Sequence, residues 1–268
     1  MVKKPHQTAT GRQARSAAGP PPIRLVAMDF DLTIYDHAQP ARTLELFDWF
    51  RHLDEIGILV GLASGRRVDE LRCPLEEIAL PWGEPFPHFV ICNEGDICTP
   101  DGIDWPGAED WNRRRRDKVR SANAILDPIF RKMVDWASRR GMATIRDIQT
   151  GAAGINVVFE TPEIAEQVRQ ELSRRLGECP QIQAERNHHI VLALPCDCSK
   201  GAALAELAAI RRIGRSQVLA IGDSFNDRSM LCGAMGFSVA AVANADQVIR
   251  REVQAAGGYV SSRRVSRG

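Results

Sequence analysis

The chain has 268 residues and a formal net charge of +1, with 44% hydrophobic and 26% charged residues. This length allows one large domain or two moderate ones, with enough residues for a sizeable core. The near-neutral charge argues against nucleic acid or a membrane surface as the main partner, and no apolar run approaches the roughly 18 residues of a transmembrane helix.

The seven cysteines are odd in number and scattered along the chain. This usage predicts reduced thiols in a cytoplasmic protein, and the N-terminus carries no apolar core of a secretory signal. Residues 1–22 contain several basic residues, no acidic residue and a closing run of prolines. We therefore expect a disordered basic tail there.

A short apolar run at 23–28 predicts a buried strand, and it ends directly in Asp29, Asp31 and Thr33. Unpaired buried carboxylates are costly in a core, whereas the carboxyl edge of a parallel sheet is where open α/β folds bind ligands. Two carboxylates there suit a hard cation and a transferred group. A turn or a helix cap is the alternative reading of this Asp-x-Asp-x-Thr pattern.

A helical pattern at 42–56 is followed by a second buried strand at 58–62, which ends in Ser64 and Gly65. A hydroxyl and backbone amides at a strand end can hold a phosphate, although an ordinary strand-to-helix turn with a serine cap looks the same. A third strand at 88–92 runs into a turn that begins at Asn93.

The pattern changes between residues 99 and 194, where hairpin, helix and hairpin signals predict a compact α+β module inserted into an α/β core. A helix is expected over about 117–139 with a kink or break at Pro128, and the arginine run at 113–116 is interpreted as a solvated helix face rather than an anion-binding patch.

The core pattern resumes at Lys200, which lies in the first turn of a helix. A lysine there opposes the helix dipole unless an anion compensates it, which favours a functional role over a surface one. A fourth buried strand at 217–221 then ends in a cluster that holds Asp223, Asn226 and Asp227.

These motifs, in this order, resemble those of the haloacid dehalogenase-like superfamily, with Asp29 to Thr33 as the first, Ser64 as the second, Lys200 as the third and residues 222–227 as the fourth. The size and place of the insertion resemble the Cof-type (IIB) branch, which includes sugar-phosphate phosphatases. Leu32 stands where that branch more often has glycine. The resemblance implies a Rossmann-like parallel sheet with helices on both faces and an inserted α+β cap domain.

The resemblance also implies a role for each motif residue. Asp29 would be the nucleophile that forms an aspartyl-phosphate, and Asp31 the acid and base, which requires an environment that raises its pKa. Lys200 would be the third catalytic residue. The remaining implied roles are phosphate binding by Ser64, Gly65, Lys200 and Asn226, and Mg²⁺ binding by Asp29, Asp31, Asp223 and Asp227. Asn226 is expected to brace Lys200 or the phosphate.

Substrate specificity is expected to come from the insertion, with Arg146, Asn156 and His188 as candidate contacts, and Asn93 of the core is a further specificity candidate. The expected division is a core of 23–96 and 196–268 with an insertion of 97–195. The expected activity is Mg²⁺-dependent hydrolysis of a small phosphorylated metabolite by a monomer or homodimer. A phosphomutase or phosphotransferase, and a non-catalytic phospho-ligand-binding protein, are the alternatives.

Overall fold

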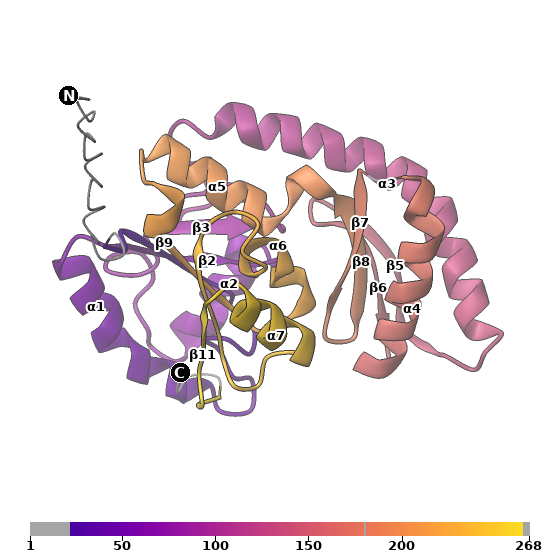
Figure 1. Ribbon diagram of the computed structural model, residues 1–268, viewed down its shortest axis with the longest axis horizontal. Coiled ribbons are helices and arrows are strands. Elements are labelled where there is room, and N and C mark those ends of the chain that lie inside the picture. Colours follow the sequence, from indigo (N-terminus) through magenta and orange to yellow (C-terminus); the bar gives the residue numbers. More distant parts are fainter. Residues whose placement is uncertain (1–21, 180, 265–268) are drawn as a thin grey trace, which may run out of the picture.

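The computed structural model describes residues 22–179 and 181–264, so the predicted basic tail lies outside the described residues except for its last position. A seven-stranded sheet forms the larger unit, and a four-stranded sheet forms a second unit beside it (Figure 1). This arrangement confirms the predicted α/β core with an inserted α+β unit. None of the helices in the described part of the chain is long and apolar enough to span a membrane.

The larger sheet has the strand order β11-β10-β9-β1-β2-β3-β4, and its neighbouring strands are parallel except that β4 runs antiparallel to β3. Its strands are β1 (Leu25–Met28), β2 (Leu59–Ala63), β3 (Phe89–Cys92), β4 (Asp96–Cys98), β9 (Val218–Gly222), β10 (Ser238–Ala241) and β11 (Tyr259–Val260). The associated helices are α1 (Phe47–Glu55), α2 (Val68–Glu77), α5 (Lys200–Ile210), α6 (Arg228–Leu231) and α7 (Gln247–Ala255).

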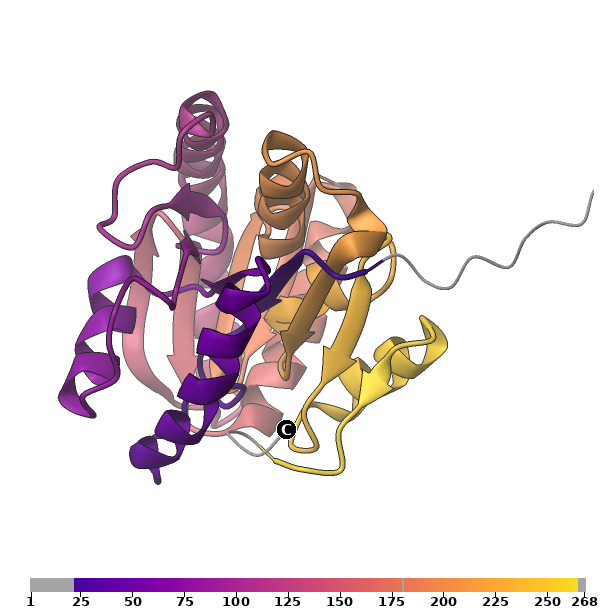
Figure 2. The same ribbon diagram turned by 90° about the vertical axis from the view of Figure 1, so that its left-hand side faces the viewer.

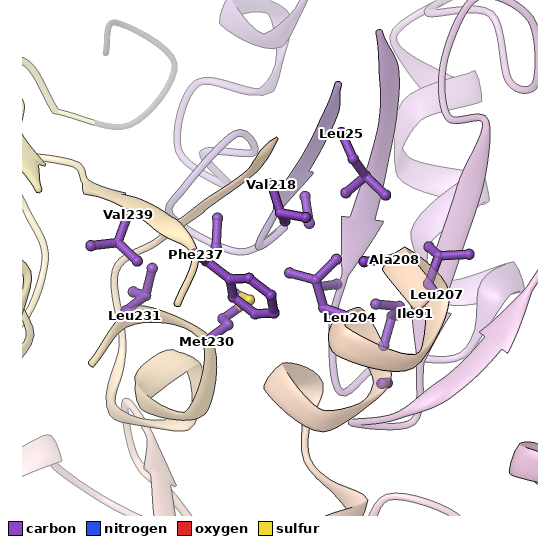
Figure 3. Packing of buried hydrophobic residues seen from close by; sticks show 14 of the residues in the cluster. Leu25, Ile91, Leu204, Leu207, Ala208, Val218, Met230, Leu231, Phe237 and Val239 are labelled. Carbon is purple, nitrogen blue, oxygen red and sulfur yellow. The ribbon is translucent and has the colours of Figure 1, made fainter. Parts of the chain in front are cut away.

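Helices cover both faces of this sheet, which is why β1 is buried along its whole length (Figure 2). Val26 and Met28 face a cluster with α1 and α2, whereas Leu25 and Ala27 face the cluster with α5, α6 and α7. Figure 3 shows Leu204 of α5 in this second cluster. The two-sided packing brings the carboxyl ends of β9, β1, β2 and β3 to one edge.

The smaller sheet is antiparallel and has the order β5-β6-β8-β7. Its elements are α3 (Glu109–Ser138), β5 (Thr144–Gly151), β6 (Gly154–Phe159), α4 (Pro162–Arg175), β7 (Ile182–Asn187) and β8 (Ile190–Pro195). The side chains of β6 alternate, so that Ile155 and Val157 pack in the cluster under α3 and α4, whereas Asn156 and Val158 point to the other face.

Pro128 lies inside α3, which is one continuous helix of 30 residues rather than two segments. We propose the division into a core of 23–96 and 196–268 and an insertion of 97–195. Strand β4 belongs to the sheet of the core although it extends past residue 96.

Candidate active site

Asp29 directly follows β1 at the carboxyl edge of the sheet and is only 4% exposed. Lys200 reaches it from the first turn of α5, with its Nζ 2.6 Å from Asp29 Oδ1 and 2.7 Å from Asp227 Oδ1. Gly201 lets α5 begin this close to its neighbour, because a Cβ there would overlap the Ser229 carbonyl. The buried ammonium therefore joins the end of β1 to the loop after β9.

The charges of this pair depend on each other. Burial and the charge of Asp227 raise the pKa of Asp29 well above its ordinary value, against the opposing effect of Lys200. Burial alone lowers the pKa of Lys200, but the carboxylates of Asp227 and Asp29 outweigh it and raise that pKa. The lysine is therefore held as a cation by the two aspartates.

Asp29, Asp223 and Asp227 each offer a carboxylate oxygen within 4.8 Å of the others. Asp223 Oδ1 accepts a hydrogen bond from Thr33, whereas its buried Oδ2 has no hydrogen-bond partner among residues 22–179 and 181–264. Asp227 Oδ2 accepts from the backbone N–H groups of Asp223 and Ser224. A cluster of buried carboxylates with an unsatisfied oxygen fits a hard divalent cation such as Mg²⁺.

Asp31 lies beside this cluster, but its carboxyl group pairs with Arg66 and His37 and not with members of the cluster. Arg66 donates to both of its oxygens at 2.7 Å, and His37 Nε2 lies 2.7 Å from Oδ1. Burial opposes ionisation, but the hydrogen bonds and charge of Arg66, together with His37, lower the pKa of Asp31 below its ordinary value. The expectation of an environment that raises this pKa is therefore wrong for this structure, because the neighbouring turn supplies a guanidinium.

The loop directly after Asp31 is in an uncommon conformation. Leu32 has a φ of 57°, in the left-handed region that favours glycine. Its carbonyl accepts a hydrogen bond from the Asn244 side chain at 2.8 Å. A preference for glycine at position 32 is therefore explained by the backbone conformation and not by a side-chain contact.

The candidate phosphate-binding residues lie after β2 and β9. Ser64 is buried, and its Oγ accepts a hydrogen bond from the Arg66 N–H at 3.2 Å. A Cβ at Gly65 would overlap Glu94 Oε1, so the close approach of Glu94 requires glycine there. Asn226 donates to Glu94 at 3.2 Å, so it braces this carboxyl group.

A cavity of about 510 Å³ opens beside the segments that follow β1, β2 and β3, between the core and the smaller sheet. It is lined by Asp31, Ser64, Gly65 and Arg66 from the core. Three of the four specificity candidates also line it, namely Asn93, Arg146 and Asn156. The fourth, His188, lies on the β7–β8 turn with its Nε2 3.5 Å from Asp223 Oδ2. His188 therefore faces the carboxylate cluster and is not part of the cavity lining.

Comparison with known proteins agrees with this geometry. A family model described as haloacid dehalogenase-like hydrolase matches residues 135–260. The match covers just under half of the chain, and this part resembles the haloacid dehalogenase-like hydrolases. A mannosylfructose-phosphate phosphatase from Agrobacterium fabrum is 26% identical over 220 residues, which cover 78% of this chain and 79% of that protein.

Solved structures share the fold of this chain at lower identity. The sucrose-phosphatase from Synechocystis sp. PCC6803, solved with sucrose and phosphate, is 20% identical with a TM-score of 0.63, and the match covers 91% of this chain and 94% of that one. The HAD subclass IIB sugar phosphatase BT4131 is 14% identical with a TM-score of 0.56, covering 89% and 93% of the two chains. At these identities the likeness concerns the fold.

Two buried carboxyl groups near the candidate site were not expected from the sequence. Glu94 has a φ of 65° in the turn after β3, and Glu185 projects from β7 of the insertion. Burial raises the pKa of both groups, and each has one carboxylate oxygen without a hydrogen-bond partner in the described ranges. The turn signal at 93–95 could have drawn attention to Glu94, but no pattern indicated that either side chain is buried.

The insertion contacts the core beside the carboxylate cluster. Arg186 Nη2 lies 2.5 Å from Asp246 Oδ2, and the Arg186 carbonyl accepts a hydrogen bond from Ser224 Oγ at 3.4 Å. Arg169 of α4 stacks over the ring of Phe225 at 4.2 Å. These contacts hold the β7–β8 hairpin against the loop that carries the fourth motif.

A second connection passes through Arg115, which is 2% exposed on α3. Its guanidinium donates to Asp96, to the carbonyl of Asn93, to that of Ala152 in the β5–β6 turn and to that of Cys198. The interpretation of the arginine run as a solvated face is therefore wrong at this position. Burial is tolerated because the guanidinium has both an ionic partner and carbonyl acceptors.

Proposed function

We propose that this hydrolase is a Mg²⁺-dependent phosphatase that cleaves a small phosphomonoester, a sugar phosphate or a related metabolite, through an aspartyl-phosphate. The observation that carries the proposal is the set of Asp29, Lys200, Asp223 and Asp227, which meet at the edge of the sheet. The cavity is lined by Asp31 and Ser64, which follow the same strand edge. The names of the relatives, which are sugar-phosphate phosphatases, support the substrate class.

In this proposal Asp29 attacks the phosphorus, so that the phosphoryl group moves to its carboxylate and the sugar alkoxide leaves. Asp29, the backbone carbonyl of Asp31 and Asp223 would hold Mg²⁺, with Asp227 supporting them, and the ion would supply positive charge beside the phosphoryl oxygens. Lys200 lies against Asp29 and would offset charge on the nucleophile and on the transferred group. Ser64 would donate its hydroxyl to a phosphoryl oxygen.

Asp31 needs a proton to protonate the leaving alkoxide, and its pair with Arg66 opposes this. Arg66 also lines the cavity, so a bound phosphate offers its guanidinium an alternative anion. We propose that Arg66 moves from Asp31 to the substrate, which frees Asp31 to act first as the acid and then as the base toward water. The guanidinium thereby links substrate binding to the protonation of Asp31.

The insertion would recognise the leaving group. The cavity wall from the smaller sheet combines the polar side chains of Arg146, Gln149 and Asn156 with the apolar side chains of Ile190 and Leu192. Such a surface can donate hydrogen bonds to hydroxyl groups and pack against the C–H face of a sugar ring. We also propose a monomer or homodimer in the cytoplasm, where the free cysteines would stay reduced.

The test is a phosphate-release screen of the purified chain over a panel of phosphorylated metabolites, with MgCl₂ or with EDTA. We expect release that depends on Mg²⁺ and is abolished in Asp29→Asn. Sugar acceptors added to the same reactions separate hydrolysis from transfer, because a transferase would produce a new phosphorylated sugar. Release that is unchanged in Asp29→Asn would contradict the proposed nucleophile.

A further inference from the structure

Two thiols lie side by side under the active-site turn. Cys92 ends β3 and Cys98 ends β4, and their sulfur atoms are 3.5 Å apart. Each residue is only 3% exposed, whereas Cys73 and Cys196 are exposed at the surface. The close approach of two buried thiols on neighbouring strands is therefore a distinct feature and not a consequence of cysteine abundance.

A separate cavity of about 370 Å³ reaches this pair. Both cysteines line it, together with the guanidinium-bearing side chains of Arg67, Arg72 and Arg116. Arg67 and Asn93 also line the larger cavity of the active site, so the two spaces adjoin. A small oxidant can therefore approach the sulfurs from a side that the substrate does not fill.

We propose that Cys92 and Cys98 form a dithiol that peroxide converts reversibly to a disulfide, and that the disulfide form of the enzyme turns over more slowly. The first half of this proposal concerns the thiols alone. The second half rests on the proposed phosphatase activity.

The local environment distinguishes the two thiols. The hydrogen bond from Cys92 lowers the pKa of the Cys98 thiol, although burial opposes this. The same contact, together with burial, raises the pKa of Cys92. Because the thiolate is the nucleophile, Cys98 reacts first and Cys92 resolves the product.

The chemistry balances with hydrogen peroxide as the oxidant. The Cys98 thiolate attacks one peroxide oxygen, so that an S–O bond forms, the O–O bond breaks and the released hydroxide becomes water. Cys92 sulfur then displaces the hydroxyl group of the Cys98 sulfenic acid, and its proton leaves with that group as a second water. The two sulfurs are oxidised to a disulfide and the peroxide is reduced to two water molecules.

The bond requires the strand pair to move. In the β3–β4 register Cys92 faces Asp96 and Cys98 faces Val90, so the cysteines are diagonal neighbours. Diagonal Cα atoms are about 7–8 Å apart, whereas disulfides usually join Cα atoms at about 4.4–6.8 Å. Contraction from the 3.5 Å contact to a bond of about 2 Å therefore pulls residue 92 toward β4.

The turn that follows residue 92 is held by several contacts, so a movement of residue 92 is passed on to its neighbours. The Asn93 carbonyl accepts from Arg115, the Asn93 side chain donates to Asp96 at 3.2 Å, and Glu94 is packed against Gly65. A shift of this turn therefore reaches both the cavity wall and the candidate phosphate-binding loop. Because misplacement by about 1 Å can cost about a hundredfold in rate, we expect turnover to fall by about tenfold to a hundredfold.

The test uses the reduced full-length chain treated with hydrogen peroxide. Asp96 lies between the two cysteines and Glu77 separates them from Cys73, so cleavage at these acidic residues leaves the two peptides joined only by a Cys92–Cys98 disulfide. We expect the joined peptides in mass spectra, altered amide hydrogen exchange at residues 93–95, and slower turnover that dithiothreitol restores. The exchange measurement needs no substrate, so it stands even if phosphatase activity fails.

The matched variants are Cys98→Ala, Cys92→Ala and the control Cys73→Ser. We expect the first two to keep their reduced-state turnover and exchange pattern in peroxide, and Cys73→Ser to respond as the unmodified chain does. Absence of the joined peptides overturns the dithiol. Joined peptides with unchanged exchange and unchanged turnover overturn the proposed effect on the enzyme, whereas altered exchange in a chain that releases no phosphate at all overturns only the proposed function.

Discussion

The substitution Asp29→Asn is expected to stabilise the metal-free protein while it abolishes turnover. Asp29 shares its site with two other carboxylates and one ammonium group. The metal-free cluster therefore carries an excess of negative charge that a divalent cation would neutralise. An uncharged side chain of nearly the same shape removes part of that excess without opening a cavity.

The size of the expected change in the free energy of unfolding follows from the distances between the charged groups. At an effective dielectric constant of about 20, each repulsion across at most 4.8 Å is at least about 3.5 kcal/mol, and the attraction to Lys200 at 2.6 Å is about 6 kcal/mol. These terms nearly cancel, so the cost of burying the charge decides the sign, in agreement with the raised pKa of Asp29, of which burial is the main cause. We expect a gain of about 1–3 kcal/mol in the free energy of unfolding, because relaxation reduces the full burial cost.

The assay is urea denaturation in EDTA and in excess MgCl₂. The Asp29→Asn variant would lack one carboxylate ligand, so Mg²⁺ should stabilise it less than it stabilises the unmodified chain. In EDTA the variant should be the more stable of the two. The control Asp48→Asn removes an exposed carboxylate and should change neither quantity. An Asp29→Asn variant that is less stable than the unmodified chain in EDTA would refute the electrostatic reasoning.

Three other substitutions test neighbouring parts of the site. Lys200→Met should lower the free energy of unfolding by about 3–5 kcal/mol in the same denaturation assay, because it leaves two buried carboxylates without their cation; unchanged stability would contradict this. Gly65→Ala should displace Glu94 and raise KM for the phosphate ester, and a KM equal to that of the unmodified chain would show that the loop can adjust. His188→Ala should weaken Mg²⁺ binding by about tenfold or more in a thermal-shift titration, and His189→Ala should not; equal effects would argue against a specific contact.

The positions of the motif residues could be predicted because each is indicated by the residues next to it in the sequence. Asp29, Ser64 and Asp223 follow apolar runs that form adjacent parallel strands, and parallel strands end at a common edge. The depth of burial at other positions is not encoded locally. Arg115 differs from the exposed Arg113 only in its angle on α3, and nothing in the sequence indicates which carbonyl groups surround it.

Strand β7 of the insertion is a second case in which burial depends on distant parts of the chain. Charged residues such as Glu185 and Arg186 are seldom fully buried unless they are paired. In the structure β7 continues through both, since Arg186 finds Asp246 of the core and Glu185 lies buried beside the site. Contacts between distant parts of the chain therefore decide these positions. The lowered pKa of Asp31 has a similar origin, because Arg66 is distant in sequence.

Helix α3 gives the insertion the mechanics of a lever (Figure 1). Its fulcrum is Arg115, whose guanidinium donates to loops of the core and also to the β5–β6 turn. Phe130 and Met133 farther along the helix pack inside the insertion. At 1.5 Å per residue the arm beyond Arg115 is about 34 Å long, so a rotation of about 5° at the fulcrum moves its far end by about 3 Å. A rotation about Arg115 would therefore change the separation of the smaller sheet from the core, although Arg115 itself does not line the cavity between them.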